Sequence, residues 1–313
     1  MGYYDWWVRR GLVEGLLAYF LFGISPVFWK LLGDIDPFDI VGYRILTSVL
    51  LLMGIHTARR RWAVLRVALQ EPRVLTMMAL SGALLATNWS VFIWAVDNNR
   101  IVEASLGYFM TPLVSVLLGV GLLGERLPRM QWTAIGVAFI GVAWLVVSTG
   151  TVPWVSLVLA ASFGLYGLIR KTAAIESLDG LTVELMWLLV PACAYLVFRL
   201  SVGEPAAVTS QPWLILALAA AGLVTAGPLL LFASSARKIP LATLGLLQFL
   251  TPSMHFVLGV WAYGEDFDAG RLVGYMLIWA ALIGFTYDAV FRGGGLSSAG
   301  LRPVRATQTR PPQ

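Results

Sequence analysis

The sequence has very little of what most catalytic and metal sites are built from. It contains one cysteine, Cys193, and two histidines, His56 and His255, among 313 residues. A disulfide needs two cysteines and a structural zinc site needs several close ligands, so both are excluded. Neither histidine has another histidine or an acid at metal-ligand spacing. We therefore expect no metal and no cofactor, and we interpret Cys193, which lies in an apolar segment, as an inert thiol.

Charged residues are also scarce, and catalytic motifs are missing. Only 12% of the residues are charged, 58% are hydrophobic, and the mean hydropathy is +0.79. Ordinary soluble domains are about 25% charged. No G-x-S-x-G, H-E-x-x-H or phosphate-binding loop occurs. Gly119-x-Gly121-x-x-Gly124 matches a dinucleotide fingerprint, but no strand precedes it, so we interpret it as close helix packing. These observations favour a membrane protein that is not an enzyme.

Long apolar segments are what the sequence has in abundance. A helix that crosses a bilayer needs roughly 20 apolar residues. The segments of this kind are 12–32, 37–55, 74–96, 101–123, 130–147, 152–170, 181–200, 213–235, 240–263 and 270–291. The first is too long for a signal-peptide core and lacks a small-x-small cleavage site, so we expect it to be retained. The sequence thus predicts an all-α integral membrane protein with ten transmembrane helices.

Two halves of the sequence repeat each other. The pattern P-x6-G-V-x3-G-E occurs at 112–125 and again at 252–265, each time after an Ala-Ser/Thr-Leu-Gly stretch. A Phe-Gly pair also precedes a lysine by seven residues in both halves, at Lys30 and Lys171. The offset is about 140 residues in every match. We therefore predict two five-helix repeats, residues 1–150 and 151–292, followed by a disordered basic tail at 293–313.

Basic residues predict the orientation, because they favour cytoplasmic loops. They concentrate after the second, fourth, sixth, eighth and tenth segments. Those residues include Arg59, Arg60, Arg61, Arg66, Arg73, Arg126, Arg129, Arg170, Lys171, Arg237, Lys238 and Arg292. Both termini are then cytoplasmic, and an odd number of helices per half inverts the second repeat. The net charge of +5 reflects this asymmetry, so we expect contact with anionic lipid and not with nucleic acid.

Several motifs together resemble one known family. They are Asn88-Trp89, Phe92-Ile-Trp-Ala-Val96, Glu103-Ala-Ser-Leu-Gly-Tyr-Phe109, Gly124-Glu-Arg126, Phe163-Gly-x-Tyr-Gly-Leu-x-Arg-Lys171 and Pro228-Leu-Leu-x-Phe232. Over residues 11–291 the chain resembles the RarD branch of the EamA-type drug/metabolite transporters. The resemblance implies ten helices in two repeats, a bacterial inner-membrane location and a transport role, without naming a substrate. Phe22, Tyr43 and Phe249 depart from the residues usual in that pattern, so the preferred solute can differ here.

Charged residues inside the apolar segments are the first candidates for a solute path. A charge near the centre of a bilayer costs roughly 2.5–3.5 kcal/mol or more, so it needs a wet cavity or a partner. Arg44, Glu103 and Lys30 all lie toward the outer face in the predicted topology. Our hypothesis is an outer vestibule in which Arg44 meets an anionic group or pairs with Glu103. The alternative is snorkelling and structural pairing near the interface.

Polar, aromatic and proline residues complete the candidate path. The expected lining comprises Asn88, Trp89, Trp94, Tyr108, Tyr166 and Gln248, and the alternative for the aromatic ones is an interfacial belt. His255 is a candidate for protonation within the cavity. Pro112 and Pro252 are predicted near the middle of the fourth and ninth helices, as hinges or as fixed packing kinks. Glu14 and Glu184 are predicted to be first-turn acids or caps, and Glu125 and Glu265 to stabilise helix ends.

The resulting prediction is a secondary transporter that moves a small organic metabolite or drug by alternating access, in efflux or exchange. We expect it to act as a monomer, with a small molecule and membrane lipid as its partners. Two alternatives remain open from the sequence: a flippase for a lipid-linked headgroup, and a membrane enzyme or signalling subunit that transports nothing.

Overall fold

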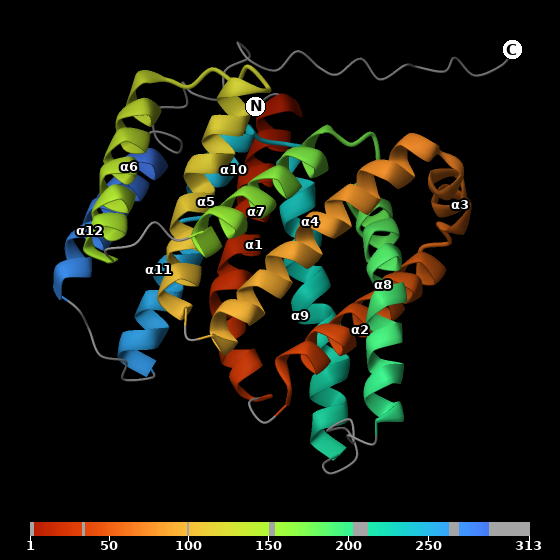
Figure 1. Cartoon of the computed structure of the whole chain (residues 1–313). Coiled ribbons are helices and arrows are strands. Elements are labelled where there is room, and N and C mark those ends of the chain that lie inside the picture. Colours follow the sequence, from red (N-terminus) through yellow and green to blue (C-terminus); the bar gives the residue numbers. More distant parts are fainter. Residues whose placement is uncertain are drawn as a thin grey trace, which may run out of the picture.

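A computed structural model describes residues 3–32, 35–98, 100–149, 154–202, 212–262 and 269–287 (Figure 1). These ranges are almost entirely helical and contain no strand. The helices are α1 (Tyr3–Lys30), α2 (Pro37–Ala58), α3 (Trp62–Gln70), α4 (Pro72–Asp97), α5 (Ile101–Gly121), α6 (Arg129–Thr149), α7 (Trp154–Thr172), α8 (Ser177–Ser201), α9 (Pro212–Ala236), α10 (Leu241–Leu247), α11 (Leu250–Val257), the π-helical η2 (Leu258–Ala262) and α12 (Ala269–Tyr287).

Seven of these helices are long and apolar enough to cross a membrane: α1, α2, α4, α6, α7, α8 and α9. Shorter apolar stretches lie in α5, in α10 with α11, and in α12. Within the described residues, each apolar segment identified in the sequence therefore falls mainly on helix. The chain is an all-helical, multi-pass membrane protein within its described residues.

Three predicted boundaries are wrong. α1 begins at Tyr3, nine residues before the predicted start, and the loop after α2 contains the short helix α3. The predicted segment 240–263 is not one helix, because the chain breaks between α10 and α11. Pro252 has no amide hydrogen to donate to the carbonyl of Gln248. That carbonyl instead accepts from the Thr251 amide at 3.0 Å, which closes a tighter turn.

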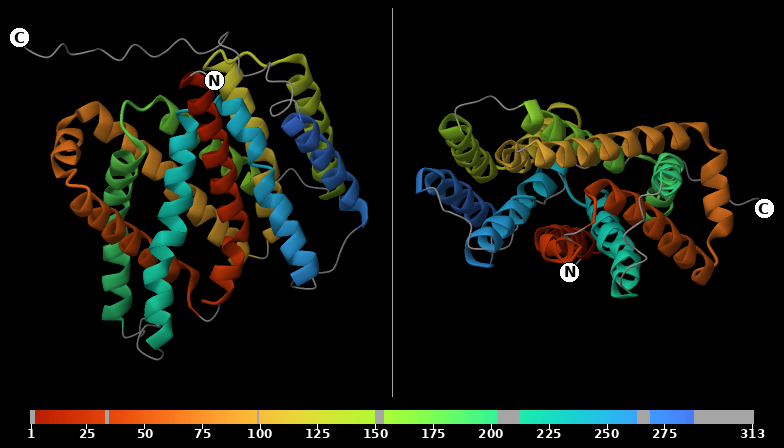
Figure 2. Two further views of the ribbon diagram at one scale, coloured as in Figure 1. Left: turned by 180° about the vertical axis from the view of Figure 1, so that it is seen from behind. Right: turned by 60° about the horizontal axis from the view of Figure 1, so that its bottom comes forward.

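The helices pack in a bundle in which distant parts of the chain alternate. α5 lies against α7, α1 against α11, α2 against α9, and α4 against α8. α1 also contacts α9, α4 contacts α7, and α2 crosses α8. α6 and α12 pair with each other at one edge, set apart from most of the bundle (Figure 2). Most helices of the first half thus find their partners in the second half.

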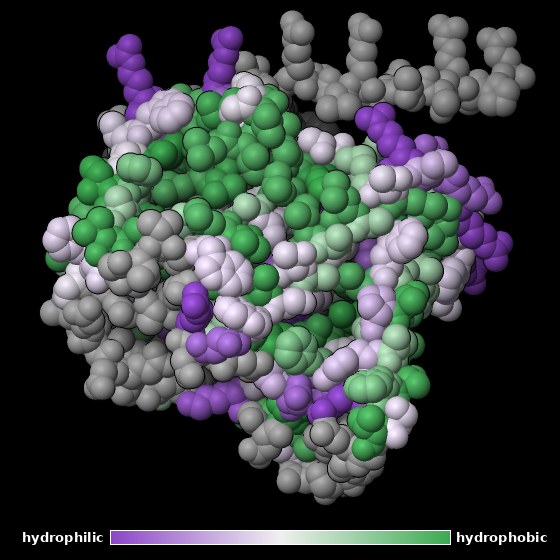
Figure 3. Space-filling view, viewed as in Figure 1, coloured by the Kyte–Doolittle hydropathy of each residue, from purple (hydrophilic) through white to green (hydrophobic). Residues whose placement is uncertain are grey.

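The bundle is apolar on its surface as well as in its core. Tyr19, Tyr166 and Phe249 are among the largest side chains that are fully buried. Leu117, Val147 and Leu216 are each at least 70% exposed. A soluble monomer rarely carries large apolar patches, whereas a lipid-facing surface requires them. Figure 3 shows apolar residues over the upper middle of one face and hydrophilic residues at its right edge, where α3 lies.

Candidate solute-binding site

Arg44 is held between two tryptophans from different helices. Its guanidinium carbon lies 4.0 Å from the ring centroid of Trp89 on α4 and 5.0 Å from that of Trp29 on α1. Its Nε donates to the Thr225 hydroxyl on α9 at 3.1 Å. Cation–π contacts of this kind are stronger away from water, so two rings stabilise a cation inside the apolar bundle. Four helices therefore converge on the side chain of Arg44.

Aromatic side chains extend this cluster toward α11. The Tyr108 side chain lies near Arg44, and its ring meets Phe92 edge-on at 5.9 Å. The ring of His255 lies 6.1 Å from that of Tyr108, and its Nε2 is 3.3 Å from the Phe22 carbonyl oxygen. The sequence predicted four of these residues as pathway lining, namely Arg44, Trp89, Tyr108 and His255. The structure brings them together.

The guanidinium of Arg44 keeps donors for a further partner. Arg44 is half-buried, and Nε is the only one of its nitrogens that bonds to a described residue. Among the side chains that the structure describes, no carboxylate forms an ion pair with it. The side chain of Glu103, its predicted alternative partner, lies outside those described. A planar guanidinium with free terminal nitrogens suits a carboxylate or another planar anion.

Two other predicted lining residues, Asn88 and Gln248, are buried within the bundle. The Asn88 amide donates to the Leu159 carbonyl and to the Ser162 hydroxyl, both at 3.0 Å, and so joins α4 to α7. Gln248 is buried and caps α10 at the break before α11. Each polar group therefore lies in the bundle, but outside the immediate contacts of Arg44.

Lys30 and Trp94 lie at the periphery. Lys30 is exposed in the last turn of α1. Trp94 is 38% exposed, packs against Trp154 at 5.1 Å between ring centroids, and has Arg100 over its ring at 5.6 Å. This arrangement resembles the interfacial belt that was the alternative interpretation for the aromatic residues.

Glu184 is the main polar residue whose position the sequence interpretation missed. It is fully buried on α8 and accepts from the Ser81 hydroxyl of α4 at 2.7 Å. Arg170 of α7 lies 3.7 Å away, and Tyr166, a predicted lining residue, is close enough to interact electrostatically. Glu184 is thus not a helix cap. Glu14 is not a cap either, because it pairs with Lys238 and Arg10.

Ion pairs join α2 and α8 at both ends. At the start of α2, Asp39 pairs with Arg199 of α8 at 3.2 Å. At the start of α8, Asp179 pairs with Arg61, which follows α2, at 2.9 Å. Glu176 also binds Arg61 at 2.7 Å, and this hydrogen bond raises the pKa of the Arg61 guanidinium. The same kind of acid–arginine pair therefore joins α2 to α8 at each end of the two helices.

The repeated glutamate motif has a structural explanation in the first half. The carboxylate of Glu125 accepts from the backbone amides of Leu241 and Ala242, at 2.7 and 2.9 Å, and thereby caps α10. Gly119 leaves room for it, since a Cβ there would meet Glu125 Oε2 at 2.5 Å. Gly124, with φ of 66°, makes the turn. The predicted helix-end role is confirmed for Glu125, and Glu265 lies outside the described residues.

The two repeated prolines differ. Pro112 lies inside continuous α5, where the Thr111 hydroxyl donates back to the Gly107 carbonyl at 2.8 Å. Pro252 lies in α11, just after the helix break, and not at mid-helix as predicted. The Thr251 hydroxyl donates to the Tyr19 carbonyl of α1 at 2.9 Å. One proline is therefore accommodated within its own helix, and the other beside a break that is tied to α1.

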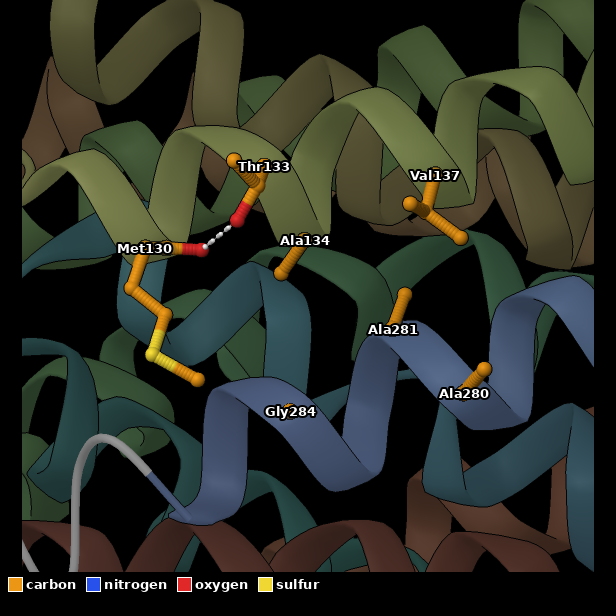
Figure 4. A pocket seen from close by; sticks show the side chains of 7 residues that line it. All are labelled: Met130, Thr133, Ala134, Val137, Ala280, Ala281 and Gly284. Carbon is orange, nitrogen blue, oxygen red and sulfur yellow. Dashed lines mark hydrogen bonds between the residues drawn. The ribbon is translucent and has the colours of Figure 1, made fainter.

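A groove of about 150 Å³ lies between α6 and α12, and neither Arg44 nor Glu184 lines it. Its lining is small or apolar, as Figure 4 shows. The one hydroxyl in it, from Thr133, already donates to the Met130 carbonyl at 2.7 Å. This groove has the character of a surface for acyl chains and offers no group that would orient a polar solute.

Of the site residues that sequence interpretation missed, some have no signal in the sequence and one has. Trp29, Thr225 and Phe92 are ordinary members of apolar helices, so only tertiary packing identifies them. Glu184 stands 140 residues after Arg44, the same offset as the repeat. Applying that offset to the charged residues would have drawn attention to it.

Comparisons with known proteins agree with this architecture. Residues 9–147 match the EamA-like transporter family. A RarD protein of Streptomyces exfoliatus is 41% identical over 97% of this chain and 98% of its own length. An uncharacterized transporter of Pseudomonas aeruginosa is 43% identical over 90% and 95%. A crystal structure at 20% identity shares the fold, with a TM-score of 0.68 over 88% of this chain and 97% of its own. The chain therefore belongs to the RarD branch of the EamA-like transporter family.

Proposed function

We propose that this protein is a monomeric secondary transporter of the bacterial inner membrane that moves a small organic solute by alternating access, in efflux or exchange. The observation that carries the proposal is the site around Arg44. A cation is held there by Trp29, Trp89 and Thr225 with no described carboxylate to neutralise it. Such a residue in a membrane bundle indicates a solute or ion pathway.

The site also suggests the chemistry of the solute. The terminal nitrogens of Arg44 suit a carboxylate or a similar planar anion. The rings of Trp29, Trp89 and Tyr108 suit an apolar or aromatic body attached to it. The hydroxyls of Thr225 and Tyr108 add hydrogen-bonding groups at the edge. We therefore place small amphipathic organic anions, including zwitterions, first among the candidate solutes.

Inverted repeats and ten crossings are part of the proposal, and the helix contacts support them. Replacing each helix by its counterpart in the other half, about 140 residues away, turns the pair α5–α7 into α10/α11–α1 and the pair α2–α9 into α8–α4. α6–α12 and α2–α8 are pairs between corresponding helices. A pseudo-two-fold axis in the membrane plane generates such a set. α1 begins and α12 ends toward the same side of the bundle, as cytoplasmic termini require (Figure 1).

Counterflow in proteoliposomes tests the function. The vesicles would be preloaded with unlabelled solute from a panel of amino acids, nucleobases and amphenicol-type drugs, and entry of the labelled solute would be measured. We expect at least one solute to show counterflow. Arg44→Ala should abolish it and Arg44→Lys should reduce it, because a point charge does not reproduce the planar fork. Arg73→Ala, at an exposed site on the start of α4, is the matched control.

The same assay tests the hinge role that we propose for the prolines. Pro112→Ala and Pro252→Ala should insert normally but slow counterflow, with the double variant slowest. Parental rates in an abundant double variant would make both prolines packing devices. Full transport by Arg44→Ala would contradict a solute role for this residue. Lipid scrambling without counterflow of any soluble solute would favour a flippase instead.

A further inference from the structure

Glu184 is a buried carboxylate whose hydrogen bonding is incomplete. The side chain is wholly inaccessible, seven residues after the first residue of α8. Oε2 accepts from the Ser81 hydroxyl at 2.7 Å, whereas Oε1 has no hydrogen-bond partner. A buried polar atom without a partner is costly, so natural proteins retain few of them without a function. The free oxygen is therefore the feature that needs explanation.

The neighbouring arginine does not complete this site. Arg170 Nη1 stands 3.7 Å from Glu184 Oε2 and is directed to the Met78 sulfur at 3.2 Å, while Nη2 donates to the Ser177 carbonyl at 2.9 Å. Its Nε has no partner, and the hydroxyl of buried Tyr166 lies near Glu184 without a hydrogen bond within 3.5 Å. Buried ion pairs that serve stability are normally fully hydrogen-bonded. This one leaves a donor, an acceptor and a hydroxyl unsatisfied around one carboxylate.

The titratable and charged groups that interact with Glu184 itself are Tyr166 and Arg170, both on α7. Others lie around the start of α8: His56 of α2 is close to Asp179, Arg61 pairs with Asp179, and Arg237 interacts with Glu176 and Arg170. His56 Nε2 bonds to the Thr182 hydroxyl at 3.0 Å, and its Nδ1 lies 3.8 Å from Asp179 Oδ1. Neither Nδ1 nor Oδ1 has a hydrogen-bond partner. Buried polar groups thus also lie at the start of α8, where Asp179 pairs with the partly exposed Arg61.

Glu184 is the residue of the second repeat that corresponds to Arg44 of the first. Asp36, Asp39 and Arg44 of α2 correspond, at an offset of 140, to Glu176, Asp179 and Glu184 of α8. The first two pairs keep an acid in both halves. The third has a cation in one half and a carboxylate in the other. α2 and α8 contact each other, so both positions lie on one helix pair.

We propose that Glu184 is a proton-binding site that couples solute movement to the proton gradient, an inference that rests on the proposed transport function. One proton from water adds to Oε1 and converts the carboxylate to a neutral carboxylic acid, whose O–H donates to the Tyr166 hydroxyl oxygen. Arg170 keeps its Ser177 and Met78 contacts in both states. Release of the proton restores the carboxylate and its attraction to Arg170.

Proton binding is testable without knowing the solute. Infrared difference spectra of the purified protein in lipid, titrated over about pH 5 to 8, would report the carbonyl stretch of a buried protonated carboxylic acid. We expect the band in the parent protein and in Glu71→Gln, an exposed control, and its loss in Glu184→Gln. Ser81→Ala should keep the band and shift its frequency, because it removes the one hydrogen bond that Glu184 accepts.

Absence of the band from the parent, or its persistence in Glu184→Gln, would show that Glu184 is a permanently ionised partner of Arg170. If Glu184→Gln fails to fold, an unshifted band in Ser81→Ala contradicts the proposal. Coupling is read separately in proteoliposomes: Glu184→Gln should retain counterflow but lose accumulation driven by a pH gradient. Gradient-driven accumulation at the parental level would overturn the coupling. A parent protein with the band and without any transport would instead refute the proposed function.

Discussion

The second helix of each half shows what the two halves share and where they differ. α2 and α8 each begin with an acid that pairs with an arginine at the far end of the other helix. Asp39 pairs with Arg199 in the last turn of α8, and Asp179 pairs with Arg61 just after α2. One and a half turns further along, the residues diverge to Arg44 and Glu184. Both ends of the α2–α8 pair thus have the same acid–arginine contacts, whereas Arg44 and Glu184, nearer the middle, carry opposite charges.

The two diverged positions also differ in their surroundings. Arg44 is half-buried among aromatic rings from other helices and keeps free donors. Glu184 is sealed among polar groups and keeps a free acceptor. An accessible cation with aromatic neighbours suits an organic anion, whereas an inaccessible carboxylate suits a proton. A duplicated fold can therefore hold two unlike sites without altering the contacts that hold its helices together.

The largest effect on stability is expected at a residue that joins the two halves. Glu125→Ala removes the carboxylate that caps α10 and leaves two backbone amides and Lys171, 3.5 Å away, without it. Breaking a buried charged contact from one side costs about 3–5 kcal/mol. Thermal unfolding in detergent should show a much lower melting temperature than for the exposed control Glu71→Ala. Equal melting temperatures would show that Glu125 does not stabilise the contact between the two halves.

A smaller effect is expected where α2 touches α9 beside Arg44. A Cβ on Gly222 would meet the Thr47 carbonyl carbon at 2.5 Å, so Gly222→Ala must push the two backbones apart. Such overpacking costs about 1–3 kcal/mol. Gly227 on the same helix has no atom within 4 Å of its Cβ position, so Gly227→Ala should be neutral or stabilise by up to about 1 kcal/mol. Equal unfolding midpoints for Gly222→Ala and Gly227→Ala would contradict the close contact at Gly222.

The smallest effects are expected at the two ends of the α2–α8 pair. Arg61 and Arg199 are both partly exposed, at 26% and 22% of their side chains. Replacing either by alanine should lower the free energy of unfolding by less than Glu125→Ala does, because water screens a partly exposed guanidinium. Similar values would support the same kind of contact at both ends. If only one of the two variants were destabilised, the two ion pairs would not contribute equally to stability.

Sequence patterns were sufficient for the all-helical membrane fold, because long apolar runs have few other outcomes. They also predicted Arg44, Trp89, Tyr108 and His255 as pathway residues, since charged and amphipathic side chains stand out in such runs, and the structure places these four in one cluster. They failed at Trp29 and Thr225, which only packing brings to Arg44. They also failed at the break before α11, since the matching proline, Pro112, lies in a continuous helix. Glu184 was misinterpreted because distance along a helix does not reveal burial by α4 and α7.

The comparison depends most directly on whether the two halves face opposite ways across the membrane. Trp62 and Val202 are corresponding, exposed positions just beyond the ends of α2 and α8. Single cysteines would be placed at each in a Cys193→Ser background and treated with an impermeant thiol reagent, added outside right-side-out membrane vesicles. The inverted repeat predicts labelling at position 202 and none at position 62 until the vesicles are opened. Labelling of both positions from outside, or of position 62 alone, would contradict the account.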